Sequence, residues 1–203
     1  MLGNIMWLFF DVGSTLVDES RANAHRLLDA IKGTELSYEQ AYARAVRLAK
    51  EKHAHPLKAR GLPLTPWHSE DETVYPEAEG CLAALRGSYK LGIIANQAPG
   101  TAERMREYGL SPYLDLIVAS AEMGLEKPDL RIFQAALARA ACRPEHAAMI
   151  GDRIDNDIVP AKRLGMTAIW IRQGFGGMAE NLTEEETPDY TVHDLRELAE
   201  LLK

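Results

Sequence analysis

An unbroken apolar run that ends at a carboxylate is the feature that most constrains the fold of this chain. Residues 5–10 read Ile-Met-Trp-Leu-Phe-Phe, and Asp11 follows directly, ahead of a Gly-Ser turn. A run of strand length without alternation is typical of a parallel sheet that is covered on both faces. Ligand sites in such sheets lie just beyond the carboxyl ends of the strands. Asp11 is therefore either a reactive group at that edge or the cap of a turn, and the run alone leaves both interpretations open.

Downstream of this run, apolar segments of strand length alternate with amphipathic segments of helix length. Strands are expected at residues 90–95, 114–119, 147–150 and 167–172, and helices at 77–86, 100–108, 128–141, 156–165 and 194–202. Strands that alternate with helices predict βα crossover units and a parallel sheet with helices on both faces. We therefore expect an α/β protein with a Rossmann-like, doubly wound parallel sheet.

Residues 17–76 interrupt this alternation, because they show helical spacing and several prolines but no strand pattern. Within this block, Ser37 and Gln40 form a capping box, which predicts the start of a second helix. We expect the block to be a small all-helical cap. The catalytic core would then consist of residues 1–16 and 77–203.

Charge and cysteine content narrow the range of partners. The 203 residues carry a net charge of −7, and their acids and bases are interspersed, which argues against nucleic-acid binding. No apolar run reaches the length that spans a membrane. Cys81 and Cys142 lie in helix-like apolar contexts and are expected to be buried free thiols. We therefore expect a cytoplasmic monomer or dimer that binds neither nucleic acid nor membrane.

Polar side chains follow the expected strands where each strand ends. Asp11 follows the first strand, Asn96 the second, Ser120 the third and Asp152 the fourth, and Lys127 lies in the loop after the third. Because the carboxyl ends of parallel strands meet at one edge of a sheet, these groups should converge. Two carboxylates with a lysine opposite form a hard-oxygen site suited to Mg²⁺ and a phosphate group.

Four ordered motifs carry a family resemblance. They are Asp11-Val-Gly-Ser-Thr15, Ile93-Ile-Ala-Asn96, Glu126-Lys127-Pro128-Asp129 and Gly151-Asp152-Arg-Ile-Asp155-Asn-Asp157. In order and spacing they resemble the motifs of the haloacid dehalogenase-like hydrolase superfamily, and the insert after the first motif resembles the cap of its phosphatase-rich branch. The resemblance covers nearly the whole chain. It implies a Mg²⁺-dependent hydrolase that acts on a small phosphorylated metabolite through an aspartyl-phosphate.

The resemblance also implies a role for each matching residue. Asp11 would be the nucleophile, and Asp11, Asp152 and the Gly13 carbonyl would be metal ligands. Asp157 would hold the metal's water or orient Lys127. Lys127 would offset the charge between the nucleophile and the phosphate. For Asp157, helix capping is the alternative interpretation.

The general acid/base is the first departure from the family's pattern. The family's phosphatases usually carry a second aspartate two residues after the nucleophile, where this chain has Gly13. Such a group contributes about 10²–10⁴-fold to the rate. The sequence therefore predicts low activity or a replacement, either a water in the space beside Gly13 or a histidine of the cap. The cap histidines are His25, His53, His55 and His68, and each can instead be an ordinary surface residue.

The second motif is the other departure. It usually ends in a Thr or Ser that hydrogen-bonds the phosphoryl group, and Ala95 stands there in this chain. Asn96 still offers its backbone N–H and its side chain. Substrate contacts are expected at Thr15, Ala95 and Asn96. We further expect Trp67 to anchor the cap on the core, with the lining of a specificity pocket as the alternative interpretation, and residues 174–177 to form a loop at the rim of the site.

Three rival functions come into question, and two of them, the phosphonatase and the sensor, stay open. A phosphonatase also has a small residue at the position of Gly13, but it needs a cap lysine for a Schiff base. The available lysines are Lys32, Lys50, Lys52 and Lys58, and for each of them a solvated helix charge is the simpler interpretation. A dehalogenase would lack the metal, and the intact motif at residues 151–157 argues against it. The third rival is a catalytically weak relative that binds a phospho-ligand as a sensor.

Overall fold

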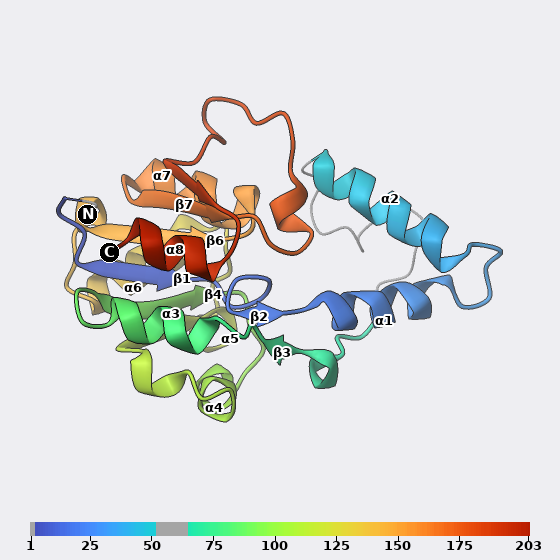
Figure 1. Ribbon diagram of the computed structural model, residues 1–203, viewed down its shortest axis with the longest axis horizontal. Coiled ribbons are helices and arrows are strands. Elements are labelled where there is room, and N and C mark those ends of the chain that lie inside the picture. Colours follow the sequence, from blue (N-terminus) through green and yellow to red (C-terminus); the bar gives the residue numbers. More distant parts are fainter. Residues whose placement is uncertain (1–2, 52–64) are drawn as a thin grey trace.

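A parallel sheet of six strands forms the centre of the computed structural model, which describes residues 3–51 and 65–203 (Figure 1). The strands are β1 (Trp7–Phe10), β4 (Lys90–Ala95), β5 (Leu116–Ala119), β6 (Ala147–Gly151), β7 (Thr167–Ile171) and β8 (Tyr190–Val192). Their order is β5-β4-β1-β6-β7-β8, and every neighbouring pair is parallel. The predicted doubly wound sheet is confirmed. β8 is an addition, because a three-residue edge strand with one buried side chain leaves little trace in the sequence.

Helices cover both faces of this sheet. They are α3 (Ala78–Leu85), α4 (Thr101–Glu107), α5 (Ser120–Met123), α6 (Leu130–Arg139), α7 (Val159–Leu164) and α8 (Leu195–Leu201). Successive side chains of a strand point to opposite faces, so Leu8 and Phe10 pack with α3 and α8 while Phe9 packs with α6. This two-sided burial explains why the run at residues 5–10 shows no alternation.

Short turns of helix complete the core. They are η2 (Ser69–Asp71), η3 (Ser111–Tyr113), η4 (Pro144–His146) and η6 (Gly176–Met178), with a π turn, η5, at Ile154–Ile158. None of the described helices is long and apolar enough to cross a membrane. Cys81 and Cys142 are free and buried, as the sequence predicts.

Two helices stand beyond the carboxyl ends of the strands (Figure 1). They are α1 (Ser20–Ile31) and α2 (Tyr38–Lys50), and they pack on each other through Leu27, Ala41 and Ala45. The predicted capping box is present, because Ser37 Oγ accepts from the backbone N–H of Gln40, and the Gln40 side chain accepts from that of Ser37. We call the described part of residues 17–76 the cap.

A small ribbon lies where the chain enters and leaves the cap. β2 (Val17–Asp18) pairs antiparallel with β3 (Thr73–Val74). The sequence predicts no strand in this block, so the ribbon corrects the expectation of an all-helical cap. Two-residue strands are too short to show periodicity. The ribbon places the two ends of the cap side by side at the edge of the core, while the predicted domain boundaries stay a prediction.

Candidate active site

A pocket of about 840 Å³ opens at the carboxyl edge of the sheet, between the core and the cap. From the core it is lined by Asp11, Gly13, Asn96, Lys127 and Asp152, and from the cap by Glu19, Asn23, Ala49, Trp67 and Glu72. Four of the five polar groups expected at the strand ends therefore meet here. Ser120 does not line the pocket, because its hydroxyl bonds the backbone of Gln97.

Lys127 lies at the centre of the site, between two carboxylates. Its ammonium lies 2.8 Å from Asp11 Oδ1 and 2.6 Å from Asp157 Oδ1, and its side chain is only 1% exposed. Burial alone would lower the pKa of Lys127, but the charges of Asp11 and Asp157 outweigh that effect and raise it. The lysine is therefore a permanent cation beside Asp11.

Asp157 uses both carboxylate oxygens within the protein. Oδ1 accepts from Lys127, and Oδ2 accepts from the backbone N–H of Arg153 at 3.0 Å. Gly151 makes room for it, since a Cβ on that residue would lie 2.3 Å from Asp157 Oδ2. Burial raises the pKa of Asp157, and Lys127 partly offsets that shift. Of the two roles expected for Asp157, this geometry favours the orientation of Lys127.

Asp152 adds a further carboxylate to the cluster. Asp11, Asp152 and Asp157 each offer an oxygen within 4.8 Å of the others. Burial, followed by the charges of Asp157 and Asp11, raises the pKa of Asp152 well above its usual range. Among the described residues, Lys127 is the one cation in direct ion-pair contact with the cluster. The cluster therefore keeps an excess of negative charge on hard oxygen donors, which fits Mg²⁺.

Glu19 fills the space beside Gly13. A Cβ placed on Gly13 would lie 2.1 Å from Oε1 of Glu19 and 2.5 Å from its Cδ. Ser14 donates from its hydroxyl to the other oxygen, Oε2, at 3.2 Å. The sequence predicts a water or a cap histidine near Gly13, and the structure places a carboxylate in this space instead.

Glu19 is half-buried in the wall of the pocket. Burial, and next the charges of Asp11 and Glu72, raise the pKa of Glu19 to about 8. Glu19 is not predicted as a site residue, because it lies at the N-cap of α1, outside the four motifs. The sequence carries no signal for it, because its position depends on the tight loop after Asp11, in which the backbone N–H groups of Leu16 and Val17 both donate to the carbonyl of Val12 and turn the chain back.

Of the three residues expected to contact the substrate, one lines the pocket and two are buried outside its lining. Asn96 lines the pocket, but its side chain is bound to the backbone of Lys127 at both ends, at 2.8 and 2.7 Å. Its amide therefore positions the lysine loop, through one of the two N–H groups on Nδ2 and through Oδ1. Ala95 and Thr15 are fully buried and do not line the pocket, whereas Ser14 does.

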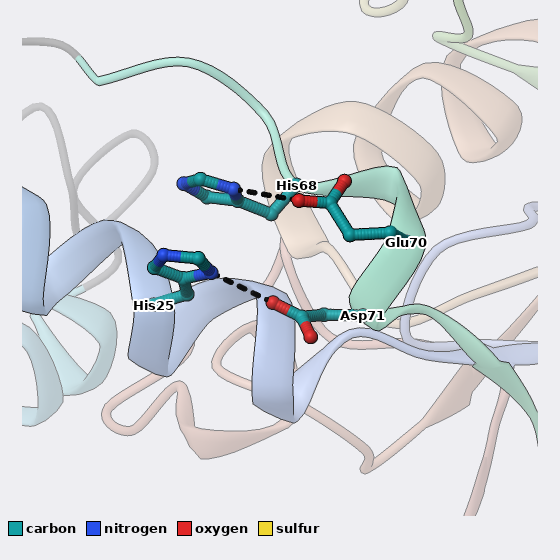
Figure 2. Close-up of side chains that lie close together, drawn as sticks. All are labelled: His25, His68, Glu70 and Asp71. Atoms are coloured by element: carbon teal, nitrogen blue, oxygen red, sulfur yellow. Dashed lines mark hydrogen bonds and ion pairs between the residues drawn. The ribbon is translucent and has the colours of Figure 1, made fainter.

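The cap histidines within the described residues lie away from the pocket lining. Figure 2 shows the rings of His25 and His68 stacked on each other, with centroids 3.5 Å apart. Asp71 lies 2.9 Å from Nδ1 of His25, and Glu70 lies 3.0 Å from Nδ1 of His68. Asp29 lies 2.8 Å from the other nitrogen of His68. His53 and His55 are outside the described residues.

Four of these residues, His25, His68, Glu70 and Asp71, offer ligand atoms within 4.8 Å of one another. The two ring planes are within 10° of parallel, so their nitrogen lone pairs run along parallel planes and do not meet at one point. The carboxylates already pair with three of the four ring nitrogens. The arrangement is therefore a set of ion pairs that joins α1 to η2.

The lysines that a phosphonatase would need do not line the pocket where they are described. Lys32 pairs with Asp29 and Lys50 with Glu180, both in exposed positions. Lys52 and Lys58 lie outside the described residues.

Aromatic side chains form part of the pocket wall. Trp67 lines the pocket, is 37% exposed and donates to Glu72 at 2.6 Å, so it does not act as the expected buried anchor. Phe175 and Gly176 line the opposite rim, as predicted for the loop after β7. The ring of Phe175 lies 5.8 Å from that of Tyr42 on α2, so this loop reaches the cap.

Fold and site together define a class of protein. A doubly wound sheet gathers carboxylates around a buried lysine at its carboxyl edge, where ligand sites of such sheets lie, and the carboxylates offer hard oxygen donors. A sequence profile of the haloacid dehalogenase-like (HAD) hydrolases matches residues 5–165. The chain belongs to this family of hydrolases.

Similar proteins include two phosphatases. The glyceraldehyde 3-phosphate phosphatase of Methanopyrus kandleri is 30% identical over 97% of this chain and 96% of its own. The phosphoserine phosphatase of Thermus thermophilus is 38% identical over 64% of this chain and 52% of its own. The structure of the HAD-hydrolase YfnB from Bacillus subtilis, bound to magnesium, has a TM-score of 0.69 at 23% identity and covers 98% of this chain and 99% of YfnB. The likeness to YfnB shows the shared fold.

Proposed function

We propose that this protein is a Mg²⁺-dependent phosphatase that hydrolyses a small phosphorylated metabolite through an aspartyl-phosphate on Asp11. The observation that carries the proposal is the position of Lys127, whose ammonium lies 2.8 Å from Asp11 at the floor of the pocket. Its second partner, Asp157, holds it there at 2.6 Å. The phosphatases among the relatives support the same reaction class.

The reaction divides into two displacements at phosphorus. The Asp11 carboxylate attacks the phosphoryl group, and the bond to the ester oxygen breaks. A water then attacks the acyl phosphate, the bond between Asp11 and phosphorus breaks, and phosphate leaves. Lys127 reduces the repulsion between the anionic nucleophile and the anionic substrate in both steps. Asp11, Asp152 and the Gly13 carbonyl would hold Mg²⁺, which when bound supplies positive charge to the phosphoryl oxygens.

The residues that line the pocket favour a small organic phosphate as the substrate. Its described wall combines the cations Arg104 and Arg153 with the rings of Trp67 and Phe175. Amides, carboxylates, hydroxyls and small apolar side chains make up the remaining wall, so a polar metabolite with a short carbon skeleton finds partners there. A cytoplasmic location and a monomeric or dimeric state stay predictions.

The test is an Mg²⁺-dependent phosphatase panel that includes glyceraldehyde 3-phosphate, phosphoserine and a pyrimidine 5′-nucleotide. We expect turnover of at least one compound by the parent, loss of that turnover on chelation of Mg²⁺, and no turnover by Asp11→Asn, which is nearly isosteric. Asp194→Asn is the matched control, because Asp194 caps α8 outside the pocket and Asn caps a helix equally well. Turnover by Asp11→Asn at the parental rate would contradict the proposal. Tight binding of one phosphorylated compound without any turnover would favour the sensor instead.

A further inference from the structure

We propose that Glu19 is the general acid and base of this site and supplies, from the start of the cap, the carboxylate that Gly13 lacks. The inference rests on the proposed function and adds to it a catalytic residue outside the four motifs. Its basis is one juxtaposition, the Glu19 carboxyl group lying where a side chain on Gly13 would begin.

A side chain on residue 13 and the carboxyl group of Glu19 in its present position exclude each other. A Cβ on Gly13 would lie 2.1 Å from Glu19 Oε1, 2.5 Å from Cδ and 2.8 Å from Oε2, all closer than non-bonded atoms approach. Gly13 itself has no left-handed backbone angle, so its conformation does not require glycine. The space that glycine leaves is what the Glu19 carboxyl group requires. The chain therefore carries one carboxyl group in this volume, delivered from residue 19 and not from residue 13.

Three features hold this carboxyl group in place. The loop after Asp11 brings Val17 back to a bridge with Gly13, which positions the start of α1 over the site. Ser14 has φ of 53°, uncommon for a residue other than glycine, and its hydroxyl donates to Glu19 at 3.2 Å. Gly174 leaves the room for that hydroxyl, because a Cβ there would lie 2.3 Å from Ser14 Oγ. A placement supported by two turns and a neighbouring loop is typical of a functional group.

The other cap groups that could take this role are already engaged or lie elsewhere. Glu72 also lines the pocket, but its two oxygens accept from Trp67 and from the hydroxyl of Tyr108, each at 2.6 Å. His25 and His68 do not line the pocket and are held by carboxylates. Among the described residues of the cap, Glu19 is thus the acid placed beside Gly13 with only a hydroxyl as its hydrogen-bond partner.

With Glu19 as acid and base, both proton transfers of the reaction have a donor and an acceptor. In the first step its carboxyl group gives a proton to the ester oxygen as that oxygen leaves phosphorus, so the alcohol departs neutral. In the second step the resulting carboxylate takes a proton from the water that attacks the acyl phosphate. Phosphate is released, the Asp11 carboxylate is restored, and Glu19 ends protonated as it began.

The first test is the leaving-group dependence of Glu19→Gln. Alkyl phosphates need their oxygen protonated, so we expect their kcat to fall by about 10²-fold or more. The first step with an acyl phosphate or an activated aryl phosphate needs no such help, so the rate of phosphorylation of Asp11 by these compounds should change much less. Glu77→Gln is the matched control, since Glu77 is also a helix N-cap residue without a side-chain capping bond but lies outside the pocket. It should leave both rates unchanged.

The second test moves the carboxyl group back to residue 13. Gly13→Asp alone should not speed the parent, because Glu19 already occupies the space. Glu19→Ala should lose alkyl-phosphate turnover. Gly13→Asp combined with Glu19→Ala should turn over alkyl phosphates at least tenfold faster than Glu19→Ala alone, because alanine leaves the volume open. A melting temperature that rises on adding beryllium fluoride and Mg²⁺ checks that each variant still binds at Asp11.

The outcomes separate the two proposals. No Asp11-dependent turnover by the parent overturns the proposed function, and the role of Glu19 falls with it. Turnover by the parent, with equal losses in the rate of Asp11 phosphorylation by alkyl and activated substrates in Glu19→Gln, or with no recovery in the double variant, overturns the role of Glu19 alone. A selective loss together with recovery supports both.

Discussion

Lys127 illustrates how much of the site rests on single side chains. Its ammonium is buried between Asp11 and Asp157, and removing it would leave both carboxylates without that partner. Breaking a buried ion pair from one side typically costs about 3–5 kcal/mol. We expect Lys127→Met to lower the free energy of unfolding by about that amount in the absence of Mg²⁺, measured by urea denaturation.

Lys90→Met is the control for that measurement. Lys90 pairs with Asp115 at 3.0 Å, but its side chain is 64% exposed, and such pairs contribute less than about 1 kcal/mol. Equal losses of stability in the two variants would contradict the view that Lys127 is the charge centre of a buried cluster.

Among the elements, the contact between α1 and η2 depends on His68. Hydrogen bonds to Asp29 and Glu70 raise the pKa of His68, and bonds from Lys32 and His68 lower the pKa of Asp29 to about 2. A raised histidine pKa gives stability that is fully present below the unfolded value of about 6.5 and is lost as the pH rises through the folded value. The lowered pKa of Asp29 gives stability that is present above its ordinary value of 3.8 and is lost as the pH falls towards 2.

We therefore expect the difference in melting temperature between the parent and His68→Gln to be largest between about pH 4 and pH 6.5. It should shrink as the pH rises through the folded pKa of His68. The side chains of His68 and Asp29 keep 15% and 16% of their surface exposed, so the effect should also weaken in high salt. A difference that is the same at pH 5.5 and pH 9 would show that His68 contributes packing and not charge.

At the level of strands and loops, part of the site could be predicted from the sequence. The carboxylate at the end of β1, the lysine after β5 and Asp152 after β6 could be predicted to meet, because parallel strands end at one edge. Glu19 could not be placed, because its position depends on how the loop after Asp11 turns back, which propensities do not reveal. The engagement of the Asn96 side chain with the backbone of Lys127 was equally hidden, since it joins two loops far apart in the sequence.

For the whole molecule, the excess negative charge at the edge of the sheet links metal binding to stability. We expect Mg²⁺ to raise the melting temperature of the parent, by an amount that corresponds to about 2.7 kcal/mol at 100 times the dissociation constant. Asp152→Asn removes one of three converging carboxylates. We expect this variant to melt above the parent in EDTA, because repulsion is relieved, and to gain little from Mg²⁺. Calorimetry with and without Mg²⁺ measures both, and an unchanged response to Mg²⁺ would remove Asp152 from the ligand set.

The central claim is that the protein works through a phosphoryl group on Asp11, with the neighbouring Glu19 carboxyl group activating the water that releases it. The most direct measurement is mass spectrometry of acid-quenched Glu19→Gln after mixing with Mg²⁺ and an acyl phosphate. Phosphorylation should proceed while its hydrolysis is slowed, so the account predicts a phosphoryl adduct on the peptide that contains Asp11, stronger than in the parent and absent when Asp11→Asn is added. Turnover without any such adduct, or an adduct on another residue, would contradict it.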